Sequence, residues 1–274
     1  MSTKERDQTL YRLSRQFLLR HPEVNEALVA KYETLVADIP RYHSLNGIYQ
    51  NLLVSAQNAN MRAGVIGGSI DSVANLGPLL HNFDPHTTFQ AFGDSEQWEQ
   101  VLDLIEQKLK PRGQVPRGSR SIWPRYCRSI LSGAQFLAKF ESAADFYQWA
   151  DYFDTDSRSR LALPMLLEAE IEGFGFALAC DFLKELGYLN FAKPDVHIRD
   201  ILVGLHFCPP KVKDYAILQT MIRIADHAKV TPYALDKVLW LIGSGYFYDD
   251  PAIGKAGRIG QQKDAFMAFA LARL

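Results

Sequence analysis

Two short stretches of the sequence carry residues that could do chemistry. Gly173-Phe174-Gly175, within "IEGFGFALA", sets two glycines around one aromatic residue, and Asp195 follows a proline further on. A Gly-x-Gly turn between two short helices points backbone N–H groups outward at the start of the second helix, where they can hold a phosphate. Glycine also lets a sugar-phosphate strand approach without a Cβ in the way. An ordinary helical hairpin explains the two glycines equally well.

The glycine pair does not fit a dinucleotide-binding loop. That loop needs a preceding strand, a third glycine and a downstream acidic residue on a second strand. The residues before Gly173 have helical spacing, and Ala179 or Cys180 stands in the place of the third glycine. We therefore exclude a nicotinamide-binding site.

Helical periodicity dominates the elements that must position these residues. Apolar residues recur with helical spacing at Val24–Leu35 and at Leu163–Ile171, and no clean alternation lasts long enough for a sheet. The sequence therefore predicts an all-α fold. Pro164 suits a first helical turn, Gly187 suits a C-terminal cap, and Asp195 suits the N-cap of a helix that runs to Leu205.

Length and composition allow one large domain or two small lobes with a substantial core. The chain has 274 residues, 47% of them hydrophobic. No apolar run reaches the ~18 residues that would span a bilayer, and the N-terminus is charged and polar, so we expect a cytoplasmic protein without a membrane partner. The three cysteines are too far apart for a metal knuckle or an iron–sulfur run, and we expect reduced thiols with no metal or cofactor.

The charges are unevenly distributed along the chain. The net charge is −1, yet the segment from Lys108 to Arg128 holds seven lysines and arginines and no acidic residue. Three prolines and two glycines in residues 110–124 mark an exposed connection between helices. This basic strip could neutralise several phosphates, and a solvated loop explains it nearly as well.

Three separated motifs together resemble the helix-hairpin-helix DNA glycosylases, which include endonuclease III, the adenine-specific mismatch glycosylase and the 8-oxoguanine glycosylases. "IEGFGFALA" resembles the family's L-P-G-V-G-x-x-x-A hairpin, and "DVHIRDI" resembles its D-T-H-V-x-R-[VI] segment. "LLVSAQNANMR" at residues 52–62 is similar to its L-L-S-x-Q-T segment. The resemblance implies two helical lobes with a DNA-binding cleft between them. We expect a central lobe at residues 46–187, with the helix-hairpin-helix at 163–187, and a second lobe at 1–45 plus 188–274.

The resemblance also implies roles for the residues of the hairpin and of the segment that follows it. Asp195 would be the catalytic carboxylate, beside C1′ of the nucleotide, while still capping its helix. Gly173, Phe174, Gly175 and Ala177 would form the DNA-binding hairpin. Ala177 stands where strand-nicking members carry a Schiff-base lysine, which predicts hydrolysis without strand scission. Lys184 and Lys193 are alternative sources of an amine.

A flipped base leaves a gap that a side chain must fill. By resemblance Gln57 is the expected wedge, with Asn58 and Asn60 near the orphaned partner base. Arg62 stands where the 8-oxoguanine branch reads the opposite cytosine. Gln57 could instead be a polar residue that ends a core helix.

The resemblance further places the base pocket on the last helix and phosphate contacts in the basic strip. Gln262 and Phe266 are similar to the glutamine and phenylalanine that hold the base in 8-oxoguanine glycosylases. Phe266 and Phe269 have the spacing of core residues as well. Arg117 and Arg120 are the expected phosphate contacts.

Departures from the family pattern narrow the expected branch. The iron–sulfur cysteines of endonuclease III are missing, and Ile171-Glu172 replaces the leucine-proline before the hairpin. We expect a monomeric glycosylase that acts with the chromosome on double-stranded DNA containing a damaged or modified base. The expected base is 8-oxoguanine, with an alkylated or otherwise modified base as the second candidate. The alternative from another class is a catalytically silent helix-hairpin-helix DNA-binding protein.

Overall fold

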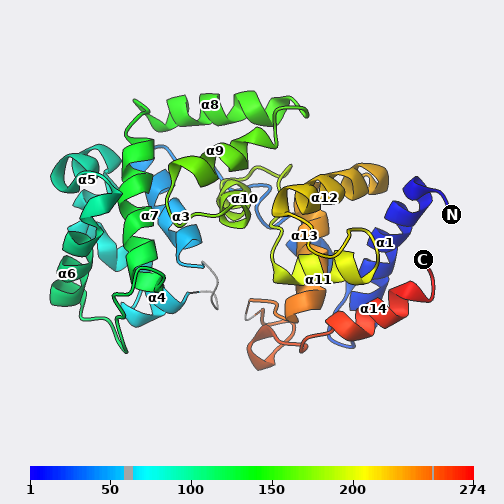
Figure 1. Cartoon of the computed structure of the whole chain (residues 1–274). Coiled ribbons are helices and arrows are strands. Elements are labelled where there is room, and N and C mark those ends of the chain that lie inside the picture. Colours follow the sequence, from blue (N-terminus) through cyan, green and yellow to red (C-terminus); the bar gives the residue numbers. More distant parts are fainter. Residues whose placement is uncertain (59–63, 249) are drawn as a thin grey trace. The chain divides into compact units, whose positions relative to one another are not determined.

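The regular secondary structure is helical throughout the described residues. The computed structural model describes residues 1–58, 64–248 and 250–274, and these contain helices and one isolated antiparallel bridge, between Tyr246 and Arg258 (Figure 1). The all-α prediction is therefore confirmed. None of the helices in these ranges is long and apolar enough to cross a membrane.

The chain divides into two compact units. One unit combines residues 1–39 with residues 187–274, and the other consists of residues 40–186. The lobes expected from the sequence are divided after residues 45 and 187, whereas these units are divided after residues 39 and 186.

The unit formed by the two ends of the chain is organised around one buried helix. Its α-helices are α1 (Thr3–Leu18), α2 (Glu26–Glu33), α11 (Val196–Gly204), α12 (Asp214–Ala228), α13 (Pro232–Ser244) and α14 (Lys263–Leu271), and the 3-10 helix η4 is Lys255–Gly257. Nearly every residue of α13 is buried, because α1, α2, α11 and α12 pack around it (Figure 1). Helix α13 is buried on nearly all sides and therefore forms the core of this unit.

The unit formed by residues 40–186 is built around α7 (Ile122–Leu137). Its other α-helices are α3 (Leu45–Ala56), α4 (Val65–Ser69), α5 (Pro85–Phe92), α6 (Trp98–Leu109), α8 (Ala143–Thr155), α9 (Ala162–Glu170) and α10 (Phe176–Glu185). Short 3-10 helices connect them: η1 (Val73–Leu79), η2 (His81–Phe83) and η3 (Ser95–Gln97). Helices α3, α5 and α6 pack against α7, and α9 and α10 pack against each other (Figure 1).

The predicted helix ends lie where the sequence places them. Gly187 has a φ of +91° just after α10, and Asp195 is the N-cap of α11. Ile198, Ile201 and Leu202 form the buried face of α11, as their spacing predicts. The closing helix is also found, as α14.

Candidate functional site

Asp195 is held by the first turn of the helix that it caps. Its Oδ1 accepts hydrogen bonds from the backbone N–H groups of His197 at 2.9 Å and Ile198 at 3.0 Å. Its backbone is extended, with φ −80° and ψ −178°, as an N-cap requires. Oδ2 accepts no hydrogen bond within the described part of the chain, and the residue is half-buried. One oxygen therefore fixes the carboxyl group and the other can meet a ligand.

The surroundings of Asp195 disfavour its negative charge. Burial raises the pKa of the Asp195 carboxyl above its ordinary value, and the charge of Asp236 raises it further. The hydrogen bond from Ile198 and the charges of Lys193 and His197 lower the pKa without cancelling these effects. Perturbed carboxyl groups of this kind are concentrated at functional sites.

Helix α13 packs against the turn that holds this carboxyl group. Asp236 lies on α13 with only 1% of its surface exposed. Further along α13, Gly243 packs so closely on α11 that a Cβ built there would lie 2.6 Å from the Cβ of His197. Because His197 belongs to the turn that Asp195 caps, the position of the carboxyl group depends on this glycine.

The predicted hairpin is present between α9 and α10, and its two glycines have different roles. Gly173 has a φ of +75°, and a Cβ there would lie 2.9 Å from both the Arg125 carbonyl oxygen and the Ser129 Oγ of α7. Phe174 is buried and packs edge-on against Phe182, with ring centroids 6.0 Å apart. Gly173 thus seats the turn on α7.

Gly175 and Ala177 form the open side of the hairpin. Gly175 is exposed and is the N-cap of α10, without a side-chain cap hydrogen bond. Ala177 is half-buried in the first turn. Lys184, one alternative amine, is 5% exposed two turns further on, and its Nζ lies 3.0 Å from Asp181 Oδ1.

The predicted gap-filling segment is only partly described. Gln57 ends α3 with 8% of its surface exposed, and its Oε1 accepts the Gly67 N–H at 3.0 Å. Asn58 Oδ1 accepts the Gly64 N–H at 3.1 Å. Both side chains therefore secure the start of α4. Asn60 and Arg62 lie outside the described residues.

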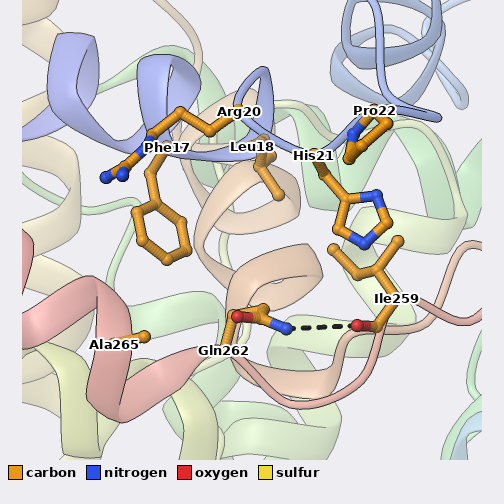
Figure 2. Close-up of a pocket in the computed structure, with 8 residues that line it drawn as sticks. All are labelled: Phe17, Leu18, Arg20, His21, Pro22, Ile259, Gln262 and Ala265. Carbon is orange, nitrogen blue, oxygen red and sulfur yellow. Dashed lines mark hydrogen bonds between the residues drawn. The ribbon is translucent and has the colours of Figure 1, made fainter.

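The last helix, α14, borders a pocket, and one of the two residues predicted to line a base pocket lies on it. Gln262 lies on a pocket of about 430 Å³, and its Nε2 donates to the Ile259 carbonyl oxygen at 3.1 Å (Figure 2). Phe266 is fully buried, with its ring edge-on to Phe17 at 5.3 Å. Phe17, rather than Phe266, presents its ring at the pocket.

The end of α1 supplies the opposite wall of this pocket. Besides Phe17, it contributes Leu18, Arg20, His21 and Pro22, and Ala265 completes the lining (Figure 2). Sequence reasoning missed these residues because they carry no motif and meet Gln262 only in the folded unit. It missed Asp236 for the same reason.

The two arginines predicted to contact phosphates have different surroundings. Arg117 donates to Asp103 Oδ1 at 2.6 Å and to Glu106 Oε2, so its guanidinium is paired with two carboxylates of α6. Arg120 is exposed and makes no hydrogen bond or ion pair within the described residues. The expected role therefore fits Arg120 better than Arg117.

Comparison with known proteins identifies one relevant fold. No protein-family model matches the chain, and neither does any curated protein. The structure is similar to that of the 8-oxoguanine glycosylase/lyase of Methanocaldococcus jannaschii, solved in complex with a 15mer DNA containing 8-oxoguanine. The TM-score is 0.50 at 16% sequence identity, over 85% of this chain and 95% of that chain. The chain thus has a helical DNA glycosylase fold.

Proposed function

We propose that this protein is a DNA glycosylase that hydrolyses the N-glycosidic bond of a damaged or modified base in double-stranded DNA. The observation that carries the proposal is Asp195, a half-buried carboxyl group that is fixed through Oδ1, leaves Oδ2 for a ligand and has a raised pKa. The glycosylase fold and the hairpin support it at the level of architecture.

Asp195 would act in its ionised form. Breaking the glycosidic bond gives the sugar oxocarbenium character, and a fixed carboxylate stabilises that charge and orients the attacking water. The N-cap bonds hold the carboxylate before DNA arrives, so the charge is preorganised. A module that only binds DNA has no use for a carboxylate with a raised pKa, which favours the enzyme over the catalytically silent alternative.

We propose that the reaction stops at hydrolysis. Ala177 offers no amine to attack C1′, and Lys184 is buried beside Asp181. Lys193, whose charge lowers the pKa of Asp195, is the amine to which a covalent adduct would point. Borohydride trapping of the protein on lesion-containing DNA should therefore give no covalent adduct. Ala177→Lys, which restores the amine of the strand-nicking members, is the matched positive variant.

For the base itself we propose the pocket at Gln262. Its Nε2 donates to Ile259, so its Oε1 is available to accept an N–H of a base, while Phe17 supplies an aromatic wall. The backbone N–H of Gln262 also donates to Ile242, the neighbour of Gly243, at 3.1 Å, and this connects the pocket to the helix that supports Asp195. Because 8-oxoguanine carries an N7–H donor that guanine lacks, it is the first candidate, followed by an alkylated purine.

One experiment tests the function. Duplexes containing 8-oxoguanine, hypoxanthine, 3-methyladenine, uracil or adenine opposite 8-oxoguanine are incubated with the protein and then treated with alkali. Cleavage of one duplex, abolished by Asp195→Asn, is the expected result. A protein that binds all duplexes and cuts none is the silent DNA-binding module.

A further inference from the structure

The seven cations of the basic strip, Lys108 to Arg128, fall into two groups. Three are paired with carboxylates: Arg112 with Asp71, Arg117 with Asp103 and Glu106, and Arg128 with Glu172. The remaining four make no ion pair or hydrogen bond through their side chains within the described residues: Lys108, Lys110, Arg120 and Arg125. The charge of this second group is uncompensated by the protein.

Arg125 lies against the hairpin. Its carbonyl oxygen is one of the two atoms that leave no room for a Cβ at Gly173. One turn further along α7, Ser129 Oγ donates to the Glu172 carbonyl oxygen at 2.7 Å, and Ser132 Oγ accepts the Glu172 N–H at 2.9 Å. These contacts therefore join the first three turns of α7 to the hairpin.

Arg128 contacts both the loop that precedes α7 and the hairpin. Its Nη1 donates to the Ser119 carbonyl oxygen at 3.3 Å, its Nε lies 3.9 Å from Glu172 Oε2, and its guanidinium lies over the Trp98 ring at 5.1 Å. Through Arg128, the residue that precedes Arg120 in the loop is thus linked to Glu172 of the hairpin.

The one acidic residue of the turn is already neutralised. Glu172 accepts a hydrogen bond from Ser95 through Oε1 and faces Arg128 through Oε2. Glu168 Oε1 lies 4.0 Å from a Cβ built at Gly175, so the uncompensated positive charge comes from the α7 side of the turn, where the backbone of Arg125 contacts Gly173.

We infer that Arg120 and Arg125 bind two phosphates of the DNA strand on either side of the point where the hairpin approaches it. Arg128 and Arg117 position this surface, Arg128 through Glu172 and Arg117 by tying the loop to α6. The inference rests on the proposed function, since it takes duplex DNA as the partner. Guanidinium groups bind phosphate through paired N–H donors, and glycines in the turn allow the strand to come close.

The test is the salt dependence of binding to an undamaged duplex, measured by fluorescence anisotropy. Each phosphate that the protein no longer neutralises should reduce the slope of log Kobs against log salt concentration by about 0.9. Arg120→Gln and Arg125→Gln should each reduce the slope by about that amount, uniformly across DNA sequences. Arg112→Gln removes the same charge from the same strip, where Asp71 already pairs with it, and should leave the slope unchanged.

Thermal unfolding of each variant shows whether a substitution affects DNA binding alone or the fold as well. An unchanged slope in folded Arg120→Gln and Arg125→Gln, or an equal reduction in Arg112→Gln, overturns the inference. So does a wild-type protein that does not bind duplex DNA at low salt. If the predicted slopes are found but no lesion is excised, the phosphate surface stands and the proposed enzyme activity fails.

Discussion

At the scale of the residue, Asp195 combines a structural and a proposed catalytic role. Asparagine caps helices as well as aspartate does, so Asp195→Asn should keep the bonds to His197 and Ile198 while removing the charge. The substitution therefore separates the two roles.

The raised pKa of Asp195 predicts a dependence of stability on pH that is opposite to that of an aspartate with a lowered pKa. A carboxyl group whose pKa is higher in the folded than in the unfolded state stabilises the fold at pH values below its unfolded pKa of about 3.9, and this contribution is lost as pH rises through the folded pKa. The free energy of unfolding of Asp195→Asn, minus that of the wild type, should therefore be larger at pH 7 than at pH 3. Urea unfolding at both pH values checks this, and a relative loss of stability at pH 7 contradicts it.

Asp236 should shift the acid limb of the activity profile to higher pH, in addition to the larger effect of burial. The proposed mechanism requires ionised Asp195, so kcat/KM should fall as pH drops through a pKa that lies above the ordinary aspartate value. Asp236→Asn removes one of the causes of that shift, and the limb should move to lower pH. Lys193 and His197 act on the same carboxyl group and remain in place. A limb that does not move in the folded variant contradicts this role.

At the scale of the element, the close packing of α13 on α11 determines where Asp195 lies. Gly243→Ala places a Cβ within 2.6 Å of the His197 Cβ, which must displace the first turn of α11. Overpacking of this kind costs about 1–3 kcal/mol. We expect lower stability together with a lower kcat. Gly68→Ala is the matched control, because a Cβ there meets nothing within 4 Å. Equal effects of the two substitutions would contradict the argument.

The sequence predicted elements better than contacts between them. The N-cap at Asp195, the glycine after α10 and the buried face of α11 follow from local chemistry and helical period, and all are found. The close approach of Gly173 to α7 could not be predicted, because it joins residues far apart in the chain. The sequence left open whether Phe266 belongs to the core or to a base pocket, and in the structure it lies in the core beside Phe17.

At the scale of the whole molecule, the ordered motifs predicted a helical glycosylase fold, and the fold comparison agrees with it. The net charge of the chain did not reveal the basic strip, because its seven cations are hidden in a near-neutral total. The structure divides that strip into cations that hold the protein together and cations that are left for a partner. This division, unlike the charge count, gives a prediction for individual arginines.

The most direct test of the central claim is single-turnover excision by wild type and Asp195→Asn on the lesion duplex that the wild type cuts. We expect the variant to bind that duplex with unchanged affinity and to lose about 10²-fold or more in rate, as for removal of one preorganised electrostatic group. Excision at the wild-type rate by folded Asp195→Asn, with the same products, would contradict the account.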